Sequence, residues 1–273
     1  RFKPKYMYTV PAYLTYITNE FKKEGIDPKK ELPDLKSIKV VAENFPIPWA
    51  EKMMDFWNSR LSEIYGSTQL LTIAGPTCER GCVYEGKRGV IHFLEHIILT
   101  EVVDRNTREP VKEGEEGEIV VTPFSKEGSP VIRFLTGDKG RLISHDMCDC
   151  GRPFSGLQSG TISRYDDMIK IKMVNIWPES VTNILFSKPG IRDYSVKVYL
   201  DNEGKEEVDL YLDFEDGIDK EYTVKVMKEL VDDIKSNVGV RMNISRVEGL
   251  ISRGADFKVR RWIDEREKGL LGH

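Results

Sequence analysis

A polar stretch in the middle of the sequence divides the chain and favours a two-domain fold. Residues 145–163 contain two cysteines, three glycines and a proline but few apolar side chains, which is typical of a connecting segment. With 273 residues in total, each flanking part is long enough to bury a core of its own. We therefore expect a boundary near Ile162, with domains at residues 1–162 and 163–273.

The charge balance and the hydropathy pattern exclude several classes of partner. The 41 basic and 45 acidic side chains give a net charge of -4, which provides no positive field to attract nucleic acid. We find no run of about 18 apolar residues that would form a membrane span, and no secretory signal. We therefore expect a cytoplasmic protein with no membrane and no nucleic-acid partner. Because the first residue is Arg1 rather than Met, we also expect a part of a larger protein.

The first part of the sequence mixes helix and strand patterns. Apolar residues at three- and four-residue spacing predict a helix that begins near Pro11 and ends before Gly25, and a second helix that begins at Pro48. The aromatic and methionine side of the second helix is interpreted as core. Strands are predicted at residues 37–41, 90–103 and 118–122. This mixture predicts an α/β fold.

The second part of the sequence predicts a small α+β domain of about 100 residues. Its order is β-α-β-β-α-β, with strands at residues 168–174, 194–200, 208–214 and 242–247, a helix at residues 178–186 and a second helix around residues 227–234. The turn Asp201-Asn202-Glu203-Gly204 joins the two central strands as a hairpin.

Three segments could bind a nucleotide. The loop Tyr65-Gly66-Ser67-Thr68-Gln69 offers an aromatic ring and two hydroxyl groups beside flexible backbone. Asp138 follows a short apolar strand and a glycine, where a carboxylate can accept two hydrogen bonds from a ribose diol. Residues 163–178 open the second domain with an Arg-Tyr-Asp-Asp sequence. Taken singly, the three segments are equally typical of a polar turn, a turn-capping aspartate and a charged turn before a strand.

Taken together and in this order, the three segments resemble the adenylate-forming superfamily, most closely its phenylacetate-CoA ligase branch. That family has a Tyr-Gly-x-Ser/Thr-Glu loop, an Arg-x-x-Thr-x-Asp turn and a Gly-Arg-x-Asp-Asp-Met hinge segment. The resemblance extends to residues 25–28, 41–44 and 252–264, so it covers nearly the whole chain. It implies the C-terminal part of a large AMP-binding domain, followed by a complete, mobile C-terminal domain.

The resemblance also implies a role for each matching residue. Those implied for the nucleotide are Ala42, Glu43 and Asn44 beside the adenine, Tyr65 and Gly66 at its ring, Ser67 and Thr68 at the phosphate, Asp138 at the ribose and Arg164 from the hinge side. Lys258 is implied as the catalytic lysine and Asp166 as the hinge. Lys170 and Lys172 are candidates for the CoA side, and a solvated strand edge explains these two lysines equally well.

Several positions depart from the family pattern. Gln69 replaces a glutamate that helps to hold Mg²⁺, and an amide is a poorer ligand for this cation than a carboxylate. Met173 and Ser163 replace glycines, and a methionine there would narrow the thiol channel. A Ser/Thr/Gly-rich phosphate loop with a lysine is absent from the sequence. Residues 155–161 have a similar composition but follow the wrong element, so we interpret them as a linker.

The four cysteines fall into two close pairs, Cys78 with Cys82 and Cys148 with Cys150. Two clustered pairs favour a metal over a disulfide framework, and thiolates favour a structural zinc ion. His92 or His96 could replace one cysteine. The resemblance agrees, because members of the phenylacetate-CoA ligase branch carry a zinc site of cysteine and histidine in this region. Free reduced thiols are the alternative.

The resemblance implies an activity with ATP/AMP, Mg²⁺ and CoA. A carboxylate, here of an aryl or arylacetic acid, attacks the α-phosphate of ATP to give an acyl-adenylate, and the thiol of CoA then displaces AMP. The expected partners are this small-molecule acid and CoA, with a homodimer or a partner chain that carries the phosphate loop. Two alternatives stay open: an adenylyltransferase that acts on a deazaflavin-type cofactor, and a non-catalytic nucleotide- or CoA-binding module.

Overall fold

The protein is represented by a computed structural model that describes residues 3–250 and 261–266. It divides into two compact units, Arg1–Asp166 and Asp167–His273, which we call the first and the second unit. The division falls directly after Asp166, the residue that the resemblance implies as the hinge, and four residues after the predicted boundary at Ile162.

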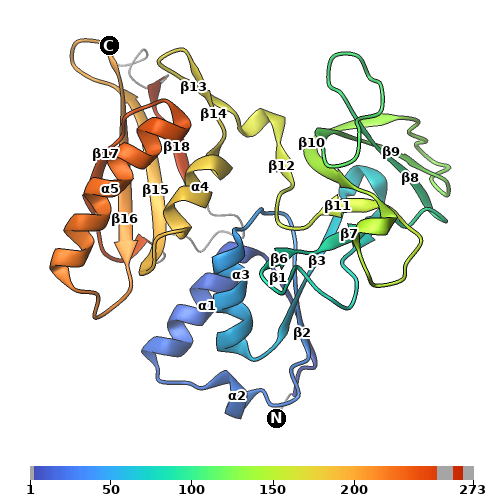
Figure 1. The fold of residues 1–273 in the computed structure, drawn as a ribbon, viewed down its shortest axis with the longest axis horizontal. Helices are drawn as coiled ribbons and strands as arrows, with labels where there is room; N and C mark the ends of the chain where they lie inside the picture. The colour runs from blue at the N-terminus through green and yellow to red at the C-terminus, as the bar shows by residue number, and fades with distance from the viewer. Residues whose placement is uncertain (1–2, 251–260, 267–273) are drawn as a thin grey trace. The chain divides into compact units, whose positions relative to one another are not determined.

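One sheet of the first unit has the strand order β1-β2-β3-β4. Strands β1 (Tyr6–Thr9), β2 (Ser37–Val40) and β3 (Arg60–Ser67) run parallel, and β4 (Thr72–Pro76) is antiparallel to β3. Helices α1 (Pro11–Lys23), α2 (Pro28–Glu31) and α3 (Ile47–Trp57) connect the parallel strands (Figure 1). The predicted helices near Pro11 and Pro48 and the strand from Ser37 are therefore confirmed.

The aromatic and methionine side of α3 lies in the core, as predicted. Trp49, Met53 and Trp57 are all buried there. The indole N–H of Trp49 donates to the Thr15 hydroxyl, and that of Trp57 donates to the Thr18 hydroxyl, both at 2.8 Å. Because these buried donors are satisfied by α1, the two helices can pack closely on the sheet.

A second sheet of the first unit has the order β7-β11-β10-β9-β8, and β12 also pairs with β10. Its strands are β7 (Val90–His92), β8 (Ile98–Val103), β9 (Glu116–Pro123), β10 (Phe134–Ile143), β11 (Gly156–Gln158) and β12 (Ser163–Arg164). A small hairpin, β5 (Val83–Tyr84) and β6 (Lys87–Arg88), precedes it. Strand β11 lies between β7 and β10, so part of the segment interpreted as a linker is built into this sheet.

The second unit is a four-stranded sheet with the order β17-β16-β15-β18. Its strands are β15 (Ile191–Leu200), β16 (Glu206–Phe214), β17 (Asn243–Arg246) and β18 (Trp262–Asp264). Helices α4 (Pro178–Phe186) and α5 (Lys220–Val238) pack on the sheet and share one apolar core with it (Figure 1). The predicted α/β and α+β fold class is confirmed.

The first strand predicted in the second unit differs in the structure. Residues 168–174 form most of a tight hairpin instead, with strands β13 (Ile169–Ile171) and β14 (Val174–Ile176). The chain reverses at Lys172 and Met173, which both have left-handed backbones with φ of 48° and 69°. Strand β18, which the apolar pattern did not predict, pairs instead with β15.

The turn of this hairpin leads to a stability prediction. Paired left-handed residues define the type of turn that favours glycine, whereas Met173 is 82% exposed and gains little from packing. We expect Met173→Gly to stabilise the second unit by about 1 kcal/mol, because a left-handed backbone costs roughly that much for a residue with a Cβ. Thermal unfolding measures it. Met173→Ala also removes most of the side chain but keeps the Cβ on the left-handed backbone. Equal unfolding temperatures of the two variants would therefore argue against backbone strain at the turn.

No helix in the described part of the chain combines the length and the apolar character needed to cross a membrane.

Candidate functional site

The loop that carries Tyr65 begins at an irregularity at the end of β3. The register of β3 and β4 shifts between Tyr65 and Gly66. A Cβ on Gly66 would lie 2.9 Å from the backbone oxygen of Thr72 and 3.0 Å from the Cα of Ile73. Only glycine allows this close approach of the two strands, which explains why the motif has one here.

The hydroxyl of the buried Tyr65 donates to the Asp138 carboxylate, with 2.8 Å between Oη and Oδ2. Burial, followed by the negative charge of Asp138, raises the pKa of Tyr65 well above its usual value. Tyr65 therefore remains a neutral donor at physiological pH. The structure brings together two predicted site residues that are 73 positions apart in the sequence.

Arg164 extends this pair toward the second unit. Strand β12 places Arg164 opposite Asp138 on β10. Its guanidinium lies 3.7 Å from the Asp138 carboxylate and donates to the Asp166 carboxylate at 3.0 Å. Tyr65, Asp138, Arg164 and Asp166 thus form one continuous polar chain, which we call the Asp138 cluster. It combines an aromatic ring, a carboxylate and a cation, the three groups that a nucleoside phosphate requires.

The hydroxyl of Ser67 next to this cluster is buried and has no hydrogen-bond partner among the described residues. A hydroxyl in this position can donate to a ligand oxygen or to water. Thr68 and Gln69 follow in a 3-10 helix, Thr68–Leu70, and both are exposed. The backbone carbonyl of Gln69 accepts a hydrogen bond from the ammonium group of Lys126.

In the segment predicted beside the adenine, the Glu43 carboxylate forms a hydrogen bond with helix α1. Ala42 has a left-handed backbone with φ of 67°, and Asn44 is half-buried. Glu43 Oε2 accepts a hydrogen bond from the backbone N–H of Ala12 at 3.0 Å. Because the capping residue of α1, Val10, has no side-chain acceptor, Glu43 satisfies a free donor in the first turn of this helix. The segment is therefore anchored to α1.

The predicted lysines of the CoA side and of catalysis belong to the second unit. Lys170 is exposed on β13, and the Lys172 ammonium pairs with Glu207 at 3.3 Å. The backbone N–H of Lys172 donates to Glu206. Lys258 lies outside the described residues.

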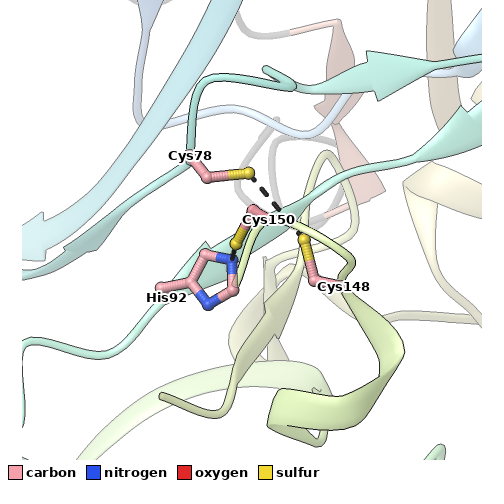
Figure 2. Close-up of side chains that lie close together, drawn as sticks. All are labelled: Cys78, His92, Cys148 and Cys150. Atoms are coloured by element: carbon pink, nitrogen blue, oxygen red, sulfur yellow. Dashed lines mark hydrogen bonds between the residues drawn. The ribbon is translucent and has the colours of Figure 1, made fainter. Parts of the chain in front are cut away.

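A second group of functional side chains lies elsewhere in the first unit. The possible metal ligands Cys78, His92, Cys148 and Cys150 lie within 4.8 Å of one another (Figure 2). The sulfur atoms of Cys78 and Cys148 are 3.8 Å apart, and Cys150 Sγ lies 3.4 Å from His92 Nε2. His92 Nδ1 lies 2.8 Å from the backbone oxygen of Phe154. A proton on Nδ1 would donate to that oxygen and leave the Nε2 lone pair free to bind a metal.

The spacing of these ligand atoms fits zinc. Two sulfur atoms bound tetrahedrally to zinc at about 2.3 Å lie about 3.8 Å apart, and a sulfur and a nitrogen lie slightly closer. Burial and the neighbouring thiols of Cys150 and Cys78 raise the pKa of Cys148 to about 12. Without a cation the Cys148 thiol would therefore stay protonated, whereas a bound Zn²⁺ would stabilise its thiolate.

Cys82 and His96 do not belong to this metal-ligand group. The group contains His92, which the sequence allows as a substitute for one cysteine, and it does not contain Cys82. Cys82 is fully buried near Glu63, and burial raises its thiol pKa well above the usual value. His96 is exposed. Cys78 and Cys82 both lie in the connection between β4 and β5, and the sequence spacing alone did not reveal which of them faces the metal-ligand group.

The structure also identifies a buried acid that the sequence patterns did not. Glu63 Oε2 accepts hydrogen bonds from the Ser159 hydroxyl at 2.7 Å and from the Gly160 backbone N–H at 2.6 Å. Burial raises the pKa of the Glu63 carboxyl to about 7, although the two hydrogen bonds and the charge of Arg88 act in the opposite direction. Its only signal in the sequence was an acidic residue on the strand of Tyr65, two positions before it.

This raised pKa predicts a pH dependence of stability. Between about pH 4.5 and about pH 7 the folded protein keeps a proton on Glu63 that the unfolded chain releases, so this group contributes stability at low pH that is lost as the pH rises. Glu63→Gln has no titrating group at this position, so we expect it to lose this pH dependence. The free energy of unfolding of the variant minus that of wild type should therefore rise by on the order of 2 kcal/mol from about pH 5 to about pH 8. Denaturant unfolding at both pH values measures this, and a constant difference would show that the Glu63 pKa is not raised.

Comparisons with known proteins support the resemblance to adenylate-forming enzymes. Residues 1–123 match the family of AMP-binding enzymes. The chain is 30% identical to a phenylacetate-coenzyme A ligase of Thermus thermophilus over 97% of this chain and 61% of that protein. It is 29% identical to a phenylacetate-coenzyme A ligase of Aromatoleum evansii, over 98% of this chain and 59% of that protein. The chain thus spans about 60% of the length of these curated relatives.

Solved structures show the same fold. A 2-hydroxyisobutyryl-CoA ligase in the postadenylation state matches 98% of this chain and 56% of its own, with a TM-score of 0.81 and 21% identity. An anthranilate CoA ligase in complex with anthranoyl-AMP matches 92% of this chain and 47% of its own, with a TM-score of 0.62 and 18% identity. Together with the sequence relatives, these findings support the resemblance: residues 1–123 match the AMP-binding enzyme family, the chain is similar in sequence to phenylacetate-coenzyme A ligases, and it shares the fold of acid–CoA ligases.

Proposed function

We propose that this chain is part of an AMP-forming acid–CoA ligase that activates a carboxylic acid as its adenylate. The Asp138 cluster is the observation that carries the proposal. It places the Tyr65 ring, the Asp138 carboxylate and the Arg164 guanidinium in contact, beside the unpartnered hydroxyl of Ser67. The sequence relatives are named phenylacetate-coenzyme A ligases, so the substrate class we propose is an aryl or arylacetic acid.

In the first step, an oxygen of the carboxylate attacks the α-phosphorus of ATP, and pyrophosphate leaves. The protein contributes positioning and charge neutralisation. The Tyr65 ring would stack on the adenine, Asp138 would accept hydrogen bonds from the ribose hydroxyls, and Ser67 and Thr68 would donate to phosphate oxygens. Arg164 and Lys258 would supply positive charge. Mg²⁺, when bound, neutralises phosphate charge, and the Gln69 amide oxygen is a weak candidate ligand for it.

In the second step, the sulfur of CoA attacks the carbonyl carbon of the adenylate, and AMP leaves. We propose that the second unit turns about Asp166 between the two steps, and that Lys170 lies on the CoA side. Lys172 is the weaker CoA candidate, because its ammonium already pairs with Glu207. Met173 stands where the family has a glycine, and this replacement favours the alternative in which the acceptor is not a thiol.

Pyrophosphate exchange and product formation test this proposal. We expect ATP–pyrophosphate exchange that depends on an aryl or arylacetic acid, and thioester formation when CoA is added. Exchange without thioester formation would favour an adenylyltransferase with another acceptor. Nucleotide binding without exchange would favour a non-catalytic module. Lys258→Ala is expected to abolish exchange but to retain thioester formation from a preformed adenylate, and equal loss of both steps would refute the role of Lys258.

We further propose that Cys78, His92, Cys148 and Cys150 bind a structural zinc ion in the first unit. When bound, zinc would link three segments, because Cys78 follows β4, His92 ends β7, and Cys148 and Cys150 lie between β10 and β11. All four positions would then be filled by protein, which is the arrangement of a structural rather than a catalytic zinc site.

A further inference from the structure

The buried polar contacts of Glu63 connect three segments that are distant in the sequence. Glu63 lies on β3, two residues before Tyr65, and it is 4% exposed. Its carboxylate binds the side chain of Ser159 and the backbone N–H of Gly160, in the segment between β11 and β12. Ser159 is completely buried. The acid thus joins the strand that carries Tyr65 to the segment that leads to Arg164.

The third segment joins at the same place through backbone contacts. The N–H of Phe45 donates to the Gly160 carbonyl at 3.2 Å. The Arg88 guanidinium donates both to the Phe45 carbonyl at 2.9 Å and to the Ser159 carbonyl at 3.0 Å. Phe45 directly follows Ala42, Glu43 and Asn44, the residues predicted beside the adenine.

Gly160 allows this tight arrangement. Its backbone is left-handed, with φ of 70°, and a Cβ would lie 2.4 Å from Arg88 Nη1 and 2.8 Å from the Phe45 ring. Phe45 itself is buried against Trp49, with 5.2 Å between ring centroids. The conformation of residues 42–45 and 158–161 is therefore set by one buried cluster, formed by Phe45, Glu63, Arg88, Ser159 and Gly160. We call it the Glu63 latch.

We propose that Glu63 is a positioning residue for the adenine-nucleotide site. It does not touch the nucleotide but holds the adenine-side segment 42–45 and the Arg164-side segment 158–161 against the strand of Tyr65. This inference rests on the proposed nucleotide binding at the Asp138 cluster. A buried carboxyl group suits this task, because one of its oxygens, Oε2, accepts both hydrogen bonds at once, and hydrogen bonds are stronger in a buried environment than in water.

A variant series separates this role from general stability. Glu63→Leu removes both acceptor bonds, Glu63→Gln keeps one oxygen as an acceptor, and Ser159→Ala removes only one donor. We expect the dissociation constant for AMP to rise at least tenfold in Glu63→Leu, to stay within about threefold of wild type in Glu63→Gln and to be intermediate in Ser159→Ala. Ser62→Ala is the matched control. Ser62 directly precedes Glu63 on β3, and its buried hydroxyl forms a hydrogen bond with that of Ser37. It should bind AMP as wild type does.

The affinities are measured by calorimetry well below the unfolding temperature of each variant, so that only folded protein is compared. Hydrogen exchange supplies an independent readout. The amides of Phe45 and Gly160 should exchange faster in Glu63→Leu, while amides of β8 and β9 should stay as protected as in wild type. If Glu63→Leu binds AMP with wild-type affinity although these two amides exchange faster, the positioning role is wrong. Unchanged exchange at both amides would also overturn it. If wild type itself binds no AMP, the proposed function fails, and the exchange data still test the latch.

Discussion

Replacing Cys148 by serine is expected to abolish stoichiometric zinc binding and to lower the unfolding temperature of the first unit by about 10 °C or more. The reason is that a hydroxyl is a far poorer zinc ligand than a thiolate, so one of four ligands is lost. The sulfur of Cys148 lies 3.8 Å from that of Cys78, at the spacing expected for a shared tetrahedral ion. The 3-10 helix His145–Met147 is the only regular element between β10 and β11 among the described residues. Ion pairs of Arg80 with Asp149 and of Arg152 with Glu79 also hold this segment, but the acidic side chain of each pair is exposed.

Metal analysis and thermal unfolding of the purified protein measure this effect. Cys82→Ser provides the matched control, because Cys82 is also a buried cysteine of the first unit but lies outside the ligand group. It should retain one zinc ion per chain. Removal of zinc from wild type with a chelator should reproduce the unfolding temperature of Cys148→Ser. If wild type has the same unfolding temperature with and without zinc, or contains no zinc as purified, the proposed zinc site is wrong.

Replacing Asp138 by alanine is expected to weaken AMP binding by about 10- to 100-fold, which corresponds to about 1.5–3 kcal/mol. Two effects act in the same direction. The ribose hydroxyls lose a charged acceptor, and the Tyr65 hydroxyl and the Arg164 guanidinium lose the group that connects them. The AMP affinity of Asp138→Asn should lie between those of wild type and Asp138→Ala, because the amide keeps one acceptor oxygen but not the charge.

The control for this experiment is Asp55→Ala, which removes an exposed aspartate of α3 in the same unit. It should leave the dissociation constant for AMP unchanged. If Asp138→Ala binds AMP as tightly as wild type while remaining folded, Asp138 has a structural role in the β10 turn and the nucleotide lies elsewhere.

The elements that could be predicted from the sequence have strong local signals. Pro11 and Gly25 bracket the first helix, and the spacing of Trp49, Met53 and Trp57 defines the apolar face of α3. These features depend only on residues within a few turns of one another. Strand β18 has no such signal, because three residues are too short for a periodic pattern and its place is set by pairing with β15.

In the candidate site, too, local motifs could be predicted and long-range contacts could not. The chemistry of Tyr65, Asp138 and Arg164 could be inferred from motif order, and the structure places all three in one cluster. The metal-ligand group was harder to predict, because the path of the loop between β4 and β5 decides whether Cys78 or Cys82 lies near His92. The partners of Glu63 lie 96 and 97 residues away, and no spacing rule connects residues so distant. Such contacts become visible only when the fold is known.

Calorimetric titration of the wild-type protein with AMP and with ATP tests the central claim most directly, because every nucleotide-binding role proposed for the first unit depends on an adenine nucleotide at the Asp138 cluster. We expect saturable binding at one site per chain, with the affinity lowered in Asp138→Ala and unchanged in Asp55→Ala. Absence of binding for both nucleotides, in protein that is folded and retains its cooperative thermal transition, would contradict the account.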